Sequence, residues 1–248
     1  MNLKLPISVC LALTLPLSAH AQSAGAGDRN WEGEAELGAL ITSGNTEETK
    51  INGRFGFKYE VEKWRNTGEF RSAFSETEGV TTTEKYRTTL ESDYKFTDRQ
   101  YWFVRGFHED DRFSGFEFQS SLITGYGNRV WEEGETSFLD LSAGAGYRFN
   151  KLEEPGADGS RDDDEAIVRI AGRYDQALSD NALFRQTLSV EMGLDEETTT
   201  TESETSVQAN IIGSLSMKAA YLVQHLSDPP GNAERTDTEI SVSLLYGF

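Results

Sequence analysis

Cysteine is nearly absent from this sequence, since Cys10 is the only one among 248 residues. Cys10 lies in an N-terminal stretch with the features of a secretory signal peptide: a positive charge at Lys4, a mostly apolar run over residues 5–17 and the small-x-small sequence Ala19-His20-Ala21. We expect residues 1–21 to be cleaved as a signal peptide. The mature chain would then hold no thiol, which excludes disulfides and cysteine-based metal sites.

Long apolar runs and basic residues are also scarce. No run of 18 apolar residues follows residue 21, which excludes a helical membrane protein. The mature chain has 22 Lys and Arg against 42 Asp and Glu, a net charge of −20. Because nucleic-acid phosphates select a basic surface, we predict no nucleic-acid partner. Helical patterning is absent too, and every proline falls in the signal peptide or in an expected loop, so the fold class predicted is all-β.

What the sequence does have is alternation. Its last residues place apolar side chains at Ile240, Val242, Leu244, Tyr246 and Phe248, with mostly polar or small residues between them. Period two predicts a strand with one apolar and one polar face. The same pattern recurs along residues 31–248, as in a transmembrane barrel whose strands face lipid on one side and the lumen on the other. We therefore predict one antiparallel transmembrane β-barrel domain over 31–248, after a short segment 22–30.

The length suits twelve strands, with ten or fourteen as alternatives. Short connections alternate with longer acidic ones, as periplasmic turns and outer loops do in the outer membrane of Gram-negative bacteria. An even strand number places both termini on the periplasmic side. The predicted strands are 31–43, 48–62, 64–77, 82–97, 100–109, 116–131, 135–150, 164–177, 181–195, 203–213, 216–226 and 235–248.

This topology assigns two groups of side chains. All four tryptophans fall beside the periplasmic end of a strand, where aromatic residues favour the membrane interface; the interface aromatics predicted are Trp31, Trp64, Trp102, Trp131 and Phe248. Charged residues of both signs fall on the polar face of the strands and should line the lumen. The lumen-lining residues predicted are Lys50, Arg54, Lys58, Arg87, Glu91, Arg105, Arg148, Arg169, Arg185, Glu191 and Glu239.

One group of residues could carry chemistry at the outer rim. His225-Leu226-Ser227 resembles the His-x-Ser of outer-membrane lipid hydrolases, in which the histidine deprotonates the serine. Glu234 could orient the histidine, with Asn232 or Glu239 as alternatives. No oxyanion hole can be assigned, and two prolines follow at once, so a plain strand end with a proline turn is the favoured interpretation.

Metal and cofactor sites have little support. The acidic loop with Asp158, Asp162, Asp163 and Asp164 lacks the spacing of a calcium-binding loop; it could bridge divalent cations to lipopolysaccharide, but a solvated loop is the simpler hypothesis. His108 precedes three acids yet is a single imidazole. Gly144 and Gly146 lie within an alternating segment, where glycine suits a bend or close packing. We predict no metal site and no cofactor.

Several stretches resemble one known family. They are Ser43-Gly44-Asn45-Thr46, Asp228-Pro229-Pro230-Gly231 and the closing segment 237–248. In order and spacing they are similar to a domain-of-unknown-function family described as salt-induced outer membrane proteins (YdiY-like). The resemblance implies an outer-membrane barrel and expression under salt or osmotic stress. It implies no reaction and no catalytic residues.

These observations favour a non-enzymatic barrel, either structural or a narrow channel. The alternatives are a lipid hydrolase using His225 and Ser227, and a soluble secreted β-sandwich. Expected partners are outer-membrane lipids and lipopolysaccharide, together with the barrel-insertion machinery through the C-terminal strand.

Overall fold

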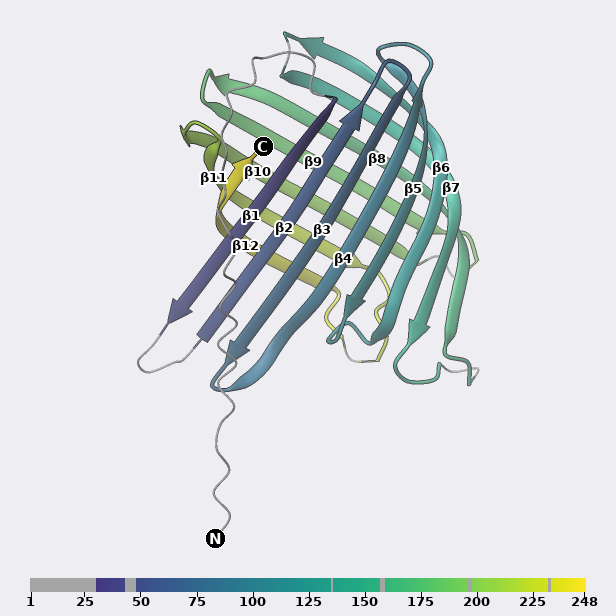
Figure 1. The fold of residues 1–248 in the computed structure, drawn as a ribbon. Helices are drawn as coiled ribbons and strands as arrows, with labels where there is room; N and C mark the ends of the chain where they lie inside the picture. Colours follow the sequence, from purple (N-terminus) through teal and green to yellow (C-terminus); the bar gives the residue numbers. More distant parts are fainter. Residues whose placement is uncertain (1–29, 43–47, 135, 157–158, 196–197, 232) are drawn as a thin grey trace.

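The computed structural model describes residues 30–42, 48–134, 136–156, 159–195, 198–231 and 233–248. The expected signal peptide, residues 22–29, the first family stretch at 43–46, Asp158 and Asn232 lie outside this part of the chain. The described residues form twelve strands in one closed antiparallel barrel (Figure 1), in which each strand pairs with its neighbours in the sequence and β1 pairs with β12. Among them, no helix is long and apolar enough to cross a membrane.

The strand boundaries follow the alternation of the sequence. The strands are β1 (Trp31–Thr42), β2 (Glu48–Glu60), β3 (Trp64–Thr77), β4 (Val80–Lys95), β5 (Gln100–Asp111), β6 (Phe116–Glu133), β7 (Ser137–Leu152), β8 (Asp162–Ser179), β9 (Ala182–Gly193), β10 (Thr199–Ile212), β11 (Leu215–Leu226) and β12 (Thr236–Gly247). The twelve-strand prediction is confirmed, and the ten-strand, fourteen-strand and sandwich alternatives are wrong.

The largest boundary error is at the start of β10. The sequence prediction began this strand at residue 203 and gave the residues before it to an acidic loop. In the structure, Thr199 pairs with Met192 and Thr200 pairs with Glu191. Threonine is β-branched and favours strands, and here that preference prevails over the acidic composition.

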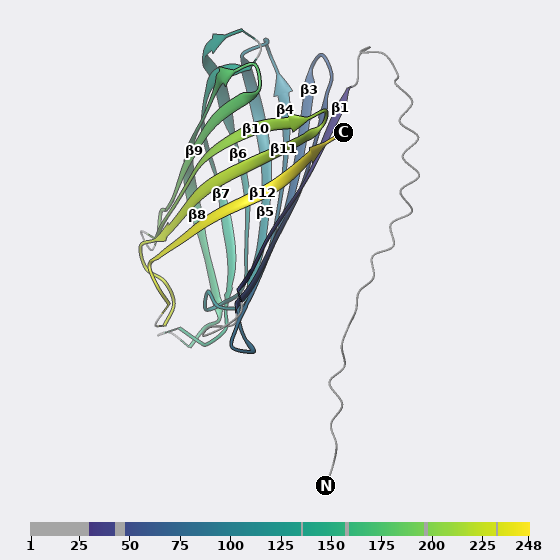
Figure 2. The ribbon, with the colours of Figure 1, turned by 90° about the vertical axis from the view of Figure 1, so that its left-hand side faces the viewer.

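The barrel closes over a short seam. The register joins Glu34–Leu37 of β1 to Leu244–Gly247 of β12, and Gly33 and Phe248 exchange backbone hydrogen bonds of 2.9 Å. Figure 2 shows the two strands meeting near the C-terminus. Closure supplies backbone partners to the ends of both outermost strands, as a barrel in lipid requires.

The two ends of the barrel differ. Trp31, Trp64, Trp102 and Trp131 all lie at one end, which we call the tryptophan end; the ring of Trp31 meets that of Phe248 edge-on at 5.9 Å. The opposite end, with the longer connections, is the loop end. Between them the outward face is apolar and exposed, as in barrels that face lipid.

Part of the inner wall is apolar and close-packed. Tyr101, Phe103, Ile123 and Ile167 form a buried cluster on β5, β6 and β8. Glycines make room for it: a Cβ on Gly144 would lie 2.9 Å from Phe103 Cζ and 3.1 Å from Ile123 Cγ2. We call this buried cluster the apolar floor.

Candidate functional site

The inside of the barrel holds one elongated cavity of about 850 Å³. Its lining includes Glu32 and Asp98 at the tryptophan end and Phe113, Pro229 and Glu234 at the loop end. Since residues from both ends line the same cavity, it runs along the barrel axis. This cavity is the candidate functional site.

Ion pairs between neighbouring strands line one side of the cavity. Arg54 on β2 donates to Glu69 on β3 at 2.6 Å and to Glu34 on β1 at 3.2 Å. Arg71 donates to the second oxygen of Glu69, also at 2.6 Å. A carboxylate that bridges two guanidiniums satisfies both and fixes their orientation, because these charge-assisted bonds are stronger than neutral ones.

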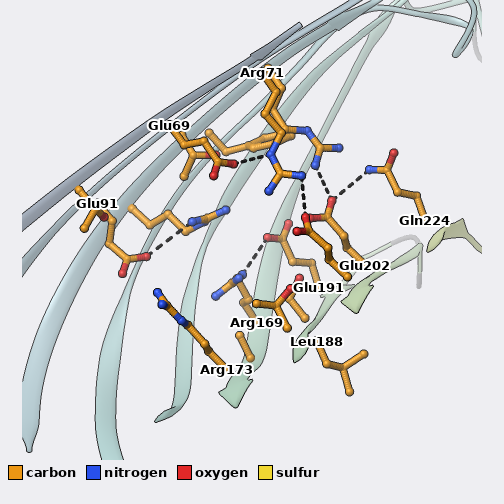
Figure 3. Close-up of a pocket in the computed structure, with 18 of the residues that line it drawn as sticks. Glu69, Arg71, Glu91, Arg169, Arg173, Leu188, Glu191, Glu202 and Gln224 are labelled. Atoms are coloured by element: carbon orange, nitrogen blue, oxygen red, sulfur yellow. Dashed lines mark hydrogen bonds and ion pairs between the residues drawn. The ribbon is translucent and has the colours of Figure 1, made fainter. Parts of the chain in front are cut away.

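Other ion pairs cross the lumen. Arg71 Nη1 on β3 lies 2.9 Å from Glu204 Oε2, and Arg87 Nη1 on β4 lies 2.5 Å from Glu202 Oε2. Both glutamates belong to β10, which is six places from β4 in the ring of twelve strands and so faces it across the barrel. We call Arg71, Arg87, Glu202 and Glu204 the cross-lumen bridge; Figure 3 shows Arg71 and Glu202 within it.

The bridge is anchored on both walls. Arg87 Nε bonds Glu109 on β5, and Lys218 on β11 donates to Glu204 at 2.9 Å. Gln224 donates to Glu202 at 3.0 Å (Figure 3). It also accepts a hydrogen bond of 3.2 Å from Lys85. The lumen is therefore spanned by a polar network that leaves the cavity continuous beside it.

Most residues predicted to line the lumen do so. Those in the cavity lining are Arg54, Lys58, Arg87, Glu91, Arg105, Arg169, Arg185 and Glu191. Arg148 is buried inside the barrel, 2.8 Å from Glu165. Lys50 and Glu239 lie on the inward-facing positions of their strands, but near the loop end of the barrel. There Lys50 pairs with Glu48, and Glu239 accepts a hydrogen bond from Asn52.

Two central residues were not among the predicted site residues. Glu202 fell in the predicted loop, and Glu204 was the second residue of the predicted strand 203–213 but was not assigned to the lumen, so the cross-lumen bridge was not foreseen. The run from Thr199 to Glu204 alternates threonine or serine with acid from position 201 onward. This alternation was the available signal.

The residues of the hydrolase hypothesis have other partners. His225 Nδ1 shares a hydrogen bond of 2.8 Å with the hydroxyl of Thr236. Ser227 Oγ accepts a bond of 2.8 Å from the backbone N–H of Thr199. Glu234 is exposed at the rim of the cavity. Among the hydrogen bonds of the described residues, none joins His225 to Ser227, so the geometry of a base and its nucleophile is not assembled.

The acidic candidates for cation binding are spread over a strand. β8 begins at Asp162, two residues earlier than predicted, and alternation places Asp163 on the face opposite to Asp162 and Asp164. Asp163 accepts from Asn150, and Asp162 lies 3.8 Å from Lys151. His108 bonds Ser120. No cluster of three or more metal-ligating side chains occurs in the described part of the chain.

Comparison with known proteins agrees with this architecture. The translocator domain of the autotransporter NalP from Neisseria meningitidis is similar in fold, with a TM-score of 0.51 and 13% identity over 90% of this chain and 89% of that one. The toluene transporter TodX of Pseudomonas putida gives a TM-score of 0.42 at 8% identity, covering 89% of this chain and 90% of TodX.

One relative in sequence aligns with most of this chain. The uncharacterized protein YdiY of Escherichia coli (strain K12) is 29% identical over 221 residues, which cover 88% of this chain and 83% of YdiY. The family model described as "Protein of unknown function, DUF481" matches residues 35–248, which is nearly the whole barrel. The chain therefore belongs to the DUF481 family.

Proposed function

We propose that the protein is a non-enzymatic barrel of the Gram-negative outer membrane, and that its lumen is a narrow channel for water and small ions. The continuous charged cavity beside the cross-lumen bridge carries this proposal. A purely structural barrel has no need of a polar passage along its axis. Ion pairs on both sides of the passage keep its wall hydrated and near neutrality, which favours weak ion selectivity.

A conductance measurement tests the channel directly. Purified, folded protein added to a planar lipid bilayer should give discrete current steps of uniform size. Their amplitude should be small for a barrel of this width, because the bridge occupies much of the lumen. Protein that is folded and inserted but electrically silent would contradict the channel and leave a structural barrel.

The proposed link to salt stress has a physical basis in the same bridge. The screening length falls from roughly 10 Å at 0.1 M salt to roughly 3 Å at 1 M. Pairs that border a water-filled cavity should weaken accordingly. In the bilayer experiment, conductance should then rise more steeply with salt than the conductivity of the solution; strict proportionality would remove this part of the proposal.

We further propose that the tryptophan end, with both termini, faces the periplasm. The mature chain is expected to lack cysteine, so a single introduced thiol can report its side. Asp228→Cys in the β11–β12 loop should react with a membrane-impermeant maleimide on intact cells. Asp98→Cys in the β4–β5 turn should react only after the outer membrane is permeabilised. The reverse pattern would invert the topology.

The envelope supplies the partners in this proposal. Acidic side chains at the loop end would meet lipopolysaccharide phosphates through divalent cations, and β12 would engage the insertion machinery. Support comes from the position of Asp162 and Asp164 at the loop-end start of β8 and from the apolar, exposed outward face of β12. No cofactor is required.

A further inference from the structure

Two arginines inside the barrel differ from all the others there. The inward-facing arginines that donate hydrogen bonds to carboxylates are Arg54, Arg65, Arg71, Arg87, Arg129, Arg148, Arg173 and Arg185. Arg105 and Arg169 also face the cavity, yet among the described residues neither donates one, and the Nε of each is buried without a partner. Within the described residues their Nη atoms donate no hydrogen bond either, and both side chains line the cavity, so these terminal donors are open to the lumen.

Acids lie nearby but do not fill those donors. Arg105 Nη1 is 3.6 Å from Glu91 Oε2, beyond hydrogen-bond length. Arg169 Nε is 3.2 Å from Glu191 Oε1 but without the direction of a hydrogen bond. Glu191 also lies 3.8 Å from Arg148, so its charge is shared between two arginines. The Nε of each arginine carries the desolvation cost of an unpaired buried donor, while the Nη atoms are the donors that a solute in the lumen could reach.

The strand register brings the two arginines over the apolar floor. Arg105 on β5 pairs with Ile123, which pairs with Gly146, which pairs with Ile167 on β8. Arg169 is two residues beyond Ile167 and so on the same face. The residues between them along this register are Ile123, Gly146 and Ile167, none of which has a side-chain acceptor. An acceptor for both must come from the lumen.

On the same wall, two carboxylates are each shared between two arginines. Asp175 binds both Arg173 and Arg185, just as Glu191 serves both Arg148 and Arg169. Figure 3 shows Arg173 beside Arg169, pointing into the cavity.

We propose that Arg105 and Arg169 form a binding site for an oxyanion inside the lumen, taking a carboxylate or a phosphate group of a small solute. The planar guanidinium presents paired donors that match such groups. This proposal adds to the proposed channel function the class of solute that would bind inside it, and so rests on that function. It does not require that ions cross the membrane.

The test uses binding and conductance separately. Thermal unfolding of the folded full-length barrel is followed by tryptophan fluorescence in sodium phosphate, in sodium gluconate and in sodium chloride of equal ionic strength. A ligand that binds only the folded state raises the midpoint. We expect phosphate or gluconate to raise it in the wild type but not in Arg105→Gln or Arg169→Gln. A higher midpoint in phosphate would identify a phosphate group as the ligand, and a higher midpoint in gluconate would identify a carboxylate.

Arg173→Gln is the matched control, because it removes an equal charge from a guanidinium already bonded to Asp175. This variant should keep the response. Arg105→Lys, which keeps the charge but loses the fork, should bind weakly and serves if the glutamine variants do not fold. An anion response equal in all variants, or none in the wild type, would overturn the site.

The two readouts separate the proposals. Phosphate should also reduce chloride current through the wild-type channel, and Arg105→Gln should abolish that block. A silent bilayer with an intact thermal response would refute the channel and keep the site. Normal conductance with no anion response would refute the site and keep the channel.

Discussion

Replacing Glu202 and Glu204 together by glutamine should raise the conductance severalfold and shift ion selectivity toward anions. These carboxylates are the β10 half of the cross-lumen bridge, bound to Arg87 and Arg71 on the facing wall. Without them, Arg71, Arg87 and Lys218 become like charges in one section of the lumen, and they repel one another. The arginine side chains should swing back toward Glu69 and Glu109 on their own wall, which widens the passage.

Single-channel current and the reversal potential across a potassium chloride gradient measure both effects. The matched control is Glu32→Gln with Glu234→Gln, which removes two charges from exposed positions at the opposite ends of the same cavity. It should change selectivity slightly and leave the current steps at wild-type size. If the bridge variant also keeps wild-type steps, ions take a route that the bridge does not limit.

The same variant should be less stable. Breaking a buried ion pair by removing one partner typically costs about 3–5 kcal/mol, because the remaining charge is left without a partner. Glu204 serves both Arg71 and Lys218, so its loss takes one partner from each of two cations, while Arg71 keeps Glu69 and Lys218 keeps Glu36 at 3.6 Å. A higher conductance from a less stable barrel would show that the bridge both holds the walls together and restricts the passage.

The barrel itself could be predicted from the sequence. In β12, the apolar positions Ile240 to Phe248 are exposed and the residues between them include the buried Ser243, as period two requires. Each strand shows its two faces independently of the others, so the strand over 100–109, which has aromatic residues on both faces, did not disturb the count. Tyr101 and Phe103 proved to face inward and belong to the apolar floor.

The cross-lumen bridge could not be predicted in this way. Alternation shows that a side chain faces the lumen, but not which residue faces it from the other wall. Arg71 and Glu204 are 133 residues apart, and their contact depends on the strand number and the register of every intervening pair. Alternation likewise predicted that Arg105 and Arg169 line the lumen. It could not show that their donors lack partners, because that depends on which side chains lie nearby in the folded barrel.

Gly146→Ala should prevent folding or destabilise the barrel strongly, although it adds a single methyl group. A Cβ on Gly146 would lie 2.7 Å from Ile123 Cα and 2.9 Å from the carbonyl carbon of Leu122. Both atoms belong to the backbone of β6, which cannot move aside as a flexible side chain could. Overpacking usually costs about 1–3 kcal/mol, and a clash with the backbone of a paired strand should exceed that range.

Gly106→Ala provides the comparison, because Gly106 is also a strand glycine but nothing lies within 4 Å of the position of its Cβ. Both substitutions reduce the freedom of the unfolded chain equally, an effect worth about 0.4–1 kcal/mol in favour of folding. Gly106→Ala should therefore match or slightly exceed wild-type stability in urea unfolding from lipid vesicles, followed by tryptophan fluorescence. Equal stability of the two variants would mean that β6 and β7 are less closely packed than the apolar floor requires. A selective loss for Gly146→Ala would show that the floor beneath Arg105 and Arg169 depends on the absence of one side chain.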